Sequence, residues 1–409
     1  MITVYLDSQD YSTLTDKKRL TPELVVVRDR LLAYSRSGLV KFVFSSVVVC
    51  EAVPLTPNSI PLAAQKADFL SDLCGKNALV SFDKLLSKEM AVLLGKAVTP
   101  VNAIDPEGNW FPEIGIPDRG SDIWQHIEFL LNEDLKQTGM TRQQRRATSR
   151  KFVKNGHPRP EFQALLDRQD GKEISAAFVA QYPMRPEHAN LMSQYILGRA
   201  SETQFMDALI GSLRDPRWMM RWFASNYSLA SPISEIVRKP GRELGEQIRT
   251  LVKLSLDYAN KLVALNPTGH NPLGRHGKLT KQWADFQDRQ ILNITRTLSN
   301  EWFHTEITDV NIDDVNASCR GLVTVLRSLY SSAWENIGGS RKEEPSESQF
   351  VDALHALYAP YVDVFRADRF MSPHIERQVT RKDGTTVVAK LQQLPEAIEK
   401  RVSENHCQT

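Results

Sequence analysis

The chain has little of what marks secreted, membrane or disulfide-rich proteins. Its 409 residues include only four cysteines, which lie far apart and fit neither a disulfide framework nor a CxxC metal or redox motif. The longest apolar run, residues 39–53, is interrupted by Lys41 and Glu51 and is too short to span a membrane. Residues 1–6 lack the basic start and long apolar stretch of a signal peptide. We therefore expect a cytoplasmic protein without membrane contacts.

Several catalytic motifs are also missing. The sequence has no glycine-rich loop of the P-loop or dinucleotide-binding kind, no GxSxG element and no HExxH spacing. Its net charge of +2 means that any nucleic acid must be bound by local basic patches and not by overall charge. The hydrophobic content of 41% is enough for a sizeable core. The length allows two or three domains, or one domain with a large insertion.

Both ends of the chain alternate short strands with helices. The amino end predicts strands at residues 2–6 and 40–44 and helices at 22–35 and 62–74. The carboxyl end predicts a helix at 346–358, strands at 362–367 and 385–391, and a closing helix at 394–402. Such alternation indicates a parallel sheet, and neither end alone supplies enough strands for a stable one. We therefore predict one α/β domain built from residues 1–86 and 346–409.

Residues 87–345 differ in character from both ends. They are polar, rich in helix-forming residues, and contain all seven tryptophans of the chain. Residues 102–120 have the proline and glycine content of a long loop, and 338–345 of a linker. Helical periodicity is strong over 122–136, 202–214, 243–265 and 315–337. The pattern predicts an all-helical insertion within the α/β domain.

Four carboxylates stand beside the predicted hydrophobic elements. Asp7 and Asp368 each follow a strand, and ligands bind at the carboxyl ends of strands in open α/β sheets. Glu51 lies in an apolar segment after the strand at 40–44, and Asp352 lies early in a helix, where its charge is favoured. Taken singly, each is more simply a turn former, a helix cap or a salt-bridge partner.

Taken together, the four carboxylates predict a cation site. Converging carboxylates repel one another unless a divalent ion neutralises them. Oxygen ligands without cysteine or histidine suit Mg²⁺ or Mn²⁺. These ions serve phosphodiester hydrolysis, because they activate water and stabilise the leaving oxygen.

The segments LDSQDYS, SSVVVCE and DALHALYAPYVDVFRAD resemble PIN-domain nucleases. The resemblance covers the two chain ends only, and Gln9 and the large insertion depart from the family pattern. It implies a flavodoxin-like parallel sheet and ribonuclease activity. It also implies that the catalytic, metal-binding residues are Asp7, Glu51, Asp352 and Asp368, with Asp10 and Asp363 as supporting groups beside them.

Basic clusters in the middle of the chain favour RNA as the substrate. Arginine and lysine neutralise phosphates, and aromatic rings stack on unpaired bases. The alternative is that the basic faces are merely solvated and that Trp218 and Trp222 belong to a core. We expect the clusters to line a groove leading to the acidic site. They comprise Arg142, Arg145, Arg146, Arg150 and Lys151; Arg214, Arg217 and Arg221, interleaved with Trp218 and Trp222; and Arg275, His276, Lys278 and Lys281.

The leading hypothesis is a divalent-metal-dependent endoribonuclease, acting as a bacterial toxin or phage-defence effector. Its insertion would hold RNA, bind a regulatory protein or mediate self-association. Two alternatives stay open: a non-catalytic module that binds nucleic acid or protein, and a metal-dependent DNA nuclease. His355, one turn after Asp352, is placed to touch a substrate phosphate, but we expect it to be a histidine on the helix surface.

Overall fold

The computed structural model divides the chain into two compact units. The first comprises Met1–Pro112 and Phe223–Thr409, and the second comprises Glu113–Trp222. The residues described are 1–54, 57–97, 100–111, 136, 139–154, 157–160, 183–196, 200–226, 243, 245–255, 257–258, 260–261, 264–265, 277–338 and 347–406.

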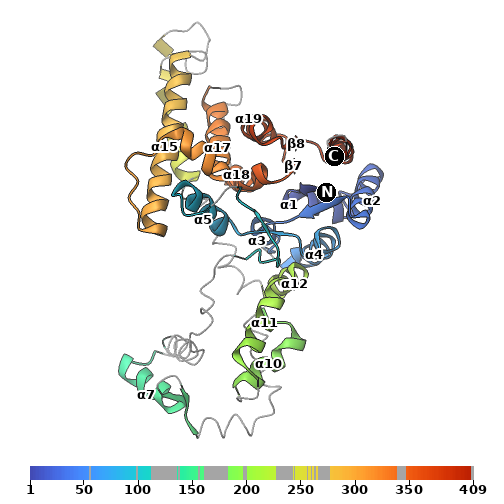
Figure 1. Cartoon of the computed structure of the whole chain (residues 1–409), viewed down its shortest axis with the longest axis vertical. Helices are drawn as coiled ribbons and strands as arrows, with labels where there is room; N and C mark the ends of the chain where they lie inside the picture. Colours follow the sequence, from blue (N-terminus) through green and yellow to red (C-terminus); the bar gives the residue numbers. More distant parts are fainter. Residues whose placement is uncertain are drawn as a thin grey trace. The chain divides into compact units, whose positions relative to one another are not determined.

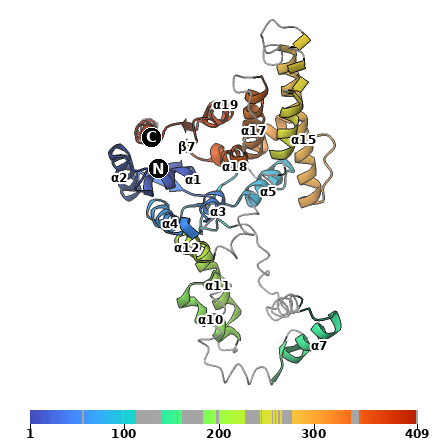
Figure 2. The ribbon, with the colours of Figure 1, turned by 180° about the vertical axis from the view of Figure 1, so that it is seen from behind.

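A four-stranded, all-parallel sheet forms the centre of the first unit. Its strand order is β2-β1-β7-β8, with β1 at Ile2–Tyr5, β2 at Val40–Val43, β7 at Val364–Arg366 and β8 at Thr386–Val388. Strand β1 pairs with β7 in a register that sets Tyr5 against Phe365. The two chain ends therefore lie side by side, as the blue and red elements do in both views (Figures 1 and 2). This sheet confirms the predicted α/β class.

A fifth short strand continues this order on the far side of β2. Strand β3 (Ala78–Leu79) meets Phe44 in a parallel bridge and pairs antiparallel with β4 (Ile104–Asp105). Numbered in chain order and with that bridge, the sheet reads 3-2-1-4-5, whereas a flavodoxin-like sheet reads 2-1-3-4-5. The four-stranded sheet by itself agrees with the flavodoxin-like order, and the single bridge to β3 departs from it. In either order the chain changes direction between β1 and β7, and such a switch point is where open α/β sheets bind ligands.

The strands are short. They are also apolar, because helices cover the sheet. Val4, Phe42 and Val364 are all fully buried, and strands without an alternating polar face are typical of parallel sheets. The strand predicted at 385–391 is shorter than expected, since a 3-10 turn, η3, begins at Leu391 (Leu391–Gln393). Between β7 and β8 the structure adds a helix that the sequence did not predict, α19 (Ser372–Asp383).

Local sequence explains where the helices of the first unit begin and end. In α2 (Pro22–Ser37), the Thr21 side chain caps the first turn and Pro22 occupies a position where no amide hydrogen bond is needed. Gly38 ends the helix at φ +71°, a left-handed conformation that glycine adopts without strain. The other helices near the sheet are α1 (Ser8–Thr15), α3 (Ser46–Glu51), α4 (Ile60–Cys74), α18 (Glu347–His355) with the 3-10 segment η2 (Ala356–Tyr361), and α20 (Leu394–His406).

Part of the predicted insertion packs with the sheet unit. Helix α17 (Arg320–Gly338) lies against η2 and α19, beside α5 (Phe82–Leu93), α15 (Gly277–Phe303) and α16 (Ile312–Ser318). The buried carboxylate of Glu89 on α5 accepts hydrogen bonds from the amides of Gly321 and Leu322 and from the hydroxyl of Tyr361. The predicted boundaries, 1–86 with 346–409 against 87–345, stay a prediction, and the compact units divide elsewhere, at 112 and 222.

The second unit contains helices and one short hairpin. Its described elements are α7 (Arg142–Phe152), α10 (Pro186–Ile196), α11 (Glu202–Leu213) and the antiparallel pair β5 (Val153–Lys154) and β6 (His157–Pro158). Helix α12 (Pro216–Ser225) crosses the boundary between the units. The hairpin and β4 correct the expectation of an all-helical insertion. Apart from Lys136 and Gly338, the predicted helix at 122–136 and the predicted linker at 338–345 lie outside the described residues, as do residues 112–120 of the predicted loop at 102–120.

Membrane insertion finds no support in the described part of the chain, where no helix has both the length and the apolarity needed to cross a bilayer.

Candidate functional site at the carboxyl edge of the sheet

Asp7 and Asp368 leave the sheet at the same edge. Asp7 follows β1 by two residues and Asp368 follows β7 by two, and these strands are parallel neighbours. The Asp7 carboxylate also caps α1, because it accepts a hydrogen bond from the amide of Gln9 at 3.0 Å. Asp368 accepts one from the amide of Met371 at 2.5 Å, just before α19. Both residues are therefore fixed by the turns that begin the next helices, at the topological switch point.

Glu51 reaches the same edge from the end of α3. Its Oε2 lies 2.7 Å from Nε2 of His355, the last residue of α18. His355 is buried, with 2% of its surface exposed, so the expectation of a surface histidine is wrong. Its position on the face of Asp352, three residues earlier, is the sequence signal that could have revealed it.

Three of these side chains lie close enough together to share one ion. Ligand atoms of Asp7, Glu51 and His355 are all within 4.8 Å of one another. The sequence analysis predicted Asp7 and Glu51 at the site and expected no histidine beside them. Two carboxylates and one imidazole favour Mn²⁺ or a later transition metal. Mg²⁺ would favour the oxygen-only set that the sequence predicted.

A buried hydrogen-bond chain lies behind the histidine. The Tyr5 hydroxyl is 2.6 Å from Nδ1 of His355 and 2.8 Å from Oγ of Ser45. Burial alone would lower the pKa of His355, but the charge and hydrogen bond of Glu51, together with Asp7 and Asp352, raise it to about 9. The imidazolium then donates to Glu51 and to Tyr5, and Tyr5 donates to Ser45. Without metal, this histidine is the cation that partly neutralises the carboxylates.

Asp352 is a largely buried acid at this edge, where its charged form is disfavoured. Burial, and next the charges of Asp7 and Asp368, raise the pKa of Asp352 to about 8. The charges of Asp7, Asp368 and Glu51 all act on Asp352, and the role of these four residues as a metal-binding set stays a prediction. Lys66 on α4 stands near Glu51, although burial lowers the pKa of its ammonium group.

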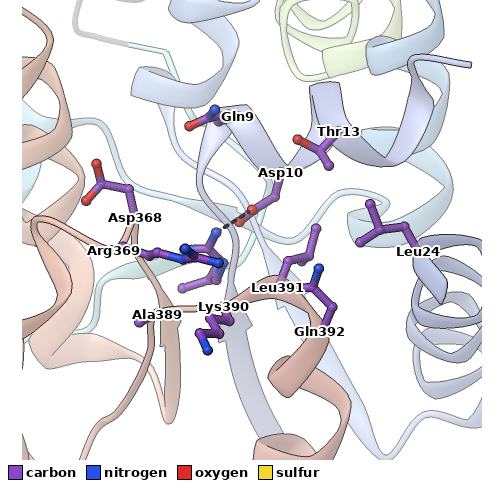
Figure 3. Close-up of a pocket in the computed structure, with 11 residues that line it drawn as sticks. Gln9, Asp10, Thr13, Leu24, Asp368, Arg369, Ala389, Lys390, Leu391 and Gln392 are labelled. Atoms are coloured by element: carbon purple, nitrogen blue, oxygen red, sulfur yellow. Dashed lines mark ion pairs between the residues drawn. The ribbon is translucent and has the colours of Figure 1, made fainter. Parts of the chain in front are cut away.

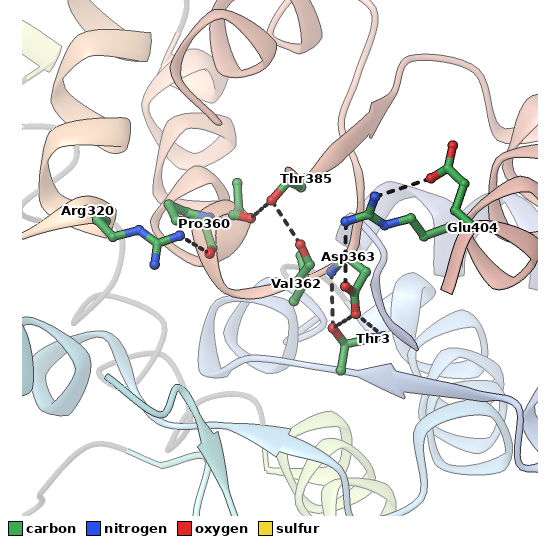
Figure 4. A network of polar contacts seen from close by, with 9 residues as sticks. Thr3, Arg320, Pro360, Val362, Asp363, Thr385 and Glu404 are labelled. Atoms are coloured by element: carbon green, nitrogen blue, oxygen red, sulfur yellow. Dashed lines mark hydrogen bonds and ion pairs between the residues drawn. The ribbon is translucent and has the colours of Figure 1, made fainter. Parts of the chain in front are cut away.

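Asp10 and Asp363, predicted as supporting groups, have different positions. Asp10 is buried beside the site, where its Oδ2 accepts a hydrogen bond from the amide of Asp7 and its Oδ1 pairs with Arg366 at 3.1 Å. Asp363 lies before β7, where it accepts hydrogen bonds from the amide and hydroxyl of Thr3 at 2.7 and 2.8 Å (Figure 4). This is the amino end of the strands, so the expectation that Asp363 stands beside the carboxylates is corrected.

The residues at the carboxyl edge fit a divalent cation. Ligand atoms of Asp7, Glu51 and His355 converge there, and the charges of Asp7, Asp368 and Glu51 add to the effect of burial in raising the pKa of Asp352. Asp7, Glu51 and His355 would hold the ion, with Asp352 and Asp368 close by. Ligation by His355 requires the neutral imidazole, so binding of an ion would displace its proton.

The predicted basic residues of the middle segment lie mainly on two helices. Arg142, Arg146 and Arg150 on α7 are exposed, and Arg145 is half-buried. On α12, Arg221 is exposed and Arg217 is half-buried, whereas Trp222 is only 5% exposed. The Trp218 indole donates to the carbonyl of Pro183 at 3.0 Å. Trp222 therefore belongs to a core, the alternative weighed against base stacking, and Arg275 and His276 of the third cluster lie outside the described residues.

Comparison of the chain with models of protein families, with curated proteins and with solved structures finds no match.

Proposed function

We propose that the chain is a divalent-metal-dependent endoribonuclease that hydrolyses RNA phosphodiester bonds. The observation that carries the proposal is the grouping of Asp7, Glu51 and His355 within 4.8 Å, beside Asp352 and Asp368, at the switch point of a parallel sheet. The likeness of its motifs to PIN-domain nucleases supports the same function. A divalent ion bound there would activate water and stabilise the leaving oxygen.

The protein's own groups have distinct tasks in this proposal. Asp7 is held by the α1 turn and by the hydrogen bond from its amide to Asp10, so its carboxylate needs no rearrangement to bind. The Tyr5–His355 chain fixes the orientation of Glu51. Asp352 is protonated near neutral pH without metal, since its pKa is about 8, and would lose its proton when a cation arrives.

The test compares Asp7→Asn with a matched control. Asp29→Asn makes the same change on α2, where the side chain is 62% exposed. Wild type and control should cut single-stranded RNA in Mn²⁺ or Mg²⁺ and not in EDTA. Asp7→Asn should cut at least roughly a hundredfold more slowly, because a direct metal ligand is lost. Wild type that leaves RNA intact with every divalent ion would refute the proposal, and equal cutting of DNA of the same sequence would extend it to DNA.

One observation favours a second candidate, a non-catalytic nucleic-acid-binding module. The ion pair between His355 and Glu51 supplies the carboxylates with a cation from within the protein. A site balanced in this way can persist without metal. Mn²⁺ titration separates the two candidates: the module would show no stoichiometric binding, and the nuclease would bind Mn²⁺ and lose that binding in Asp7→Asn.

A further inference from the structure

A pocket adjoins the acidic site on the side of β7 and β8. Its volume is about 250 Å³, and it lies between the first turn of α1, the segment after β7 and the turn after β8 (Figure 3). Asp368 belongs both to its lining and to the charges that raise the pKa of Asp352. The pocket and the carboxylate group therefore share a wall.

Arg366 lines this pocket and has two buried donor atoms with no acceptor in the described part of the chain. Its side chain is 12% exposed, and one terminal nitrogen pairs with Asp10 at 3.1 Å. Its Nε and Nη1 atoms are buried and have no hydrogen-bond partner among the residues that the structure describes. Buried guanidinium donors without acceptors are costly. Phosphate oxygens accept strongly from a guanidinium, so a phosphate that reached either donor would remove part of that cost.

The remaining charges of the lining also favour an anion. Arg369 and Lys390 are exposed at the pocket, which the carboxylates Asp10 and Asp368 also line. With Arg366 the lining thus holds three cations against two carboxylates. The neighbouring amide side chains, Gln9 and Gln392, can donate or accept hydrogen bonds with a sugar or base.

We propose that this pocket binds a phosphate group, with Arg366 as the buried cation and with Arg369 and Lys390 as the exposed cations. For the source of that phosphate the inference rests on the proposed function: it is the phosphate of the RNA strand next to the linkage at Asp7 and Glu51. Holding it would set which linkage meets the carboxylates. A free mononucleotide or inorganic phosphate carries the same chemistry and is the other source.

Binding in EDTA tests the pocket without any cleavage. The probes are a short fluorescent single-stranded RNA, adenosine monophosphate and inorganic phosphate, each titrated into the full chain. The double variant Arg369→Gln/Lys390→Gln removes only exposed side chains and should fold normally. Arg366→Lys keeps the charge beside Asp10 but loses the Nε and Nη1 donors. The control, Arg377→Gln/Lys400→Gln, removes two exposed cations outside the pocket.

For a strand phosphate, the pocket double variant should bind RNA roughly tenfold more weakly, with a salt slope lower by roughly 0.7 for each lost contact. Arg366→Lys should also weaken binding, and the control should match wild type. Loss of mononucleotide and phosphate binding with unchanged RNA binding would assign the pocket to a free phosphate and overturn the strand assignment. Unchanged binding of all three probes in both pocket variants would overturn the pocket itself.

The outcomes also separate this inference from the proposed function. Wild type that binds RNA through Arg369 and Lys390 but never cuts it would overturn the nuclease and retain the pocket. Wild type that cuts RNA in Mn²⁺ while the pocket variants bind RNA normally would overturn the pocket and retain the nuclease.

Discussion

The hydroxyl of Tyr5 lies 2.6 Å from Nδ1 of His355, although 350 residues separate them in the chain. Tyr5 is the last residue of β1 and His355 the last of α18, so this contact joins the two chain ends directly beneath the carboxylates. The phenol also stacks on Phe365 of β7, with ring centroids 5.2 Å apart. The side chain that orients the site is thus also part of the core.

Removing either member of this contact should destabilise the metal-free protein. Tyr5→Phe leaves Ser45 and His355 without their shared partner and should cost about 1–3 kcal/mol in the free energy of unfolding. His355→Gln takes the cation from Glu51, which is partly exposed, and should cost a similar amount. Urea unfolding in EDTA measures both. Tyr34→Phe is the control: it removes an exposed hydrogen bond from α2 to Glu399 and should change little. Equal stability of all three variants would contradict the prediction.

Stability without metal should fall as the pH rises from about 4 to about 9. Burial is the main reason that the pKa of Asp10 is raised to about 7 and that of Asp352 to about 8. The stability that these protonated carboxyls contribute is fully present below their ordinary pKa of 3.8. It is lost as the pH rises through 7 and 8. The pKa of His355, raised from 6.5 to about 9 by Glu51 against the effect of burial, acts in the same direction at higher pH. Thermal unfolding in EDTA across this range measures the loss.

Two comparisons check that the carboxylate group causes the pH effect. Asp352→Asn cannot ionise at this position and should unfold with a flatter pH profile, gaining at least about 1 kcal/mol over wild type near pH 9. Mn²⁺ should restore most of the wild-type stability at high pH, because it replaces the lost protons as counter-charge. A wild-type profile that rises with pH, or one identical in Asp352→Asn, would contradict the explanation.

Gly321 should not tolerate a side chain. A Cβ there would lie 2.6 Å from the carbonyl oxygen of Leu357 and 2.8 Å from Oε1 of Glu89. Gly321→Ala should therefore cost at least about 2 kcal/mol, as overpacking does in a core. The matched control is Gly211→Ala in α11, where nothing lies within 4 Å and alanine should stabilise by about 0.5–1 kcal/mol. Hydrogen exchange measures the unfolding of both variants. The change in the free energy of unfolding should be a loss for Gly321→Ala and a gain for Gly211→Ala.

The basic face of α7 should contribute to RNA affinity but not to chemistry. Changing Arg145, Arg146 and Arg150 together to Ala should weaken RNA binding, and the salt slope should fall by roughly 0.7 for each lost phosphate contact. Turnover of bound RNA should change little, because these groups hold the substrate and do not touch the reacting bond. The triple variant Arg36→Ala/Arg377→Ala/Lys400→Ala is the control. If both triple variants bind as wild type at every salt concentration, α7 is better explained as a surface for a protein partner or self-association.

Local sequence was sufficient for the elements that carry the carboxylates. The apolar run before Asp7, the cap at Thr21 and the glycine at 38 each determine a strand end or a helix end within a few residues. Counting strands also indicated that the ends share a sheet, because neither has enough partners alone. The convergence of Asp7 and Glu51 followed from these two facts, since parallel strands present their carboxyl ends at one edge.

Other features depended on contacts between distant segments. His355 and Asp363 show this most clearly: one was expected on the surface and is buried against Tyr5, and the other was expected at the site but bonds to Thr3 at the opposite end of the strands. The position of Asp363 depends on where the three-residue strand β7 begins. Periodicity in the sequence does not locate the start of so short a strand to one residue. The packing of α17 on Glu89 and the pocket at Arg366 likewise require side chains from remote segments. Sequence determined which residues could serve the site, and tertiary packing decided which of them meet, because burial and pairing are properties of the assembled chain.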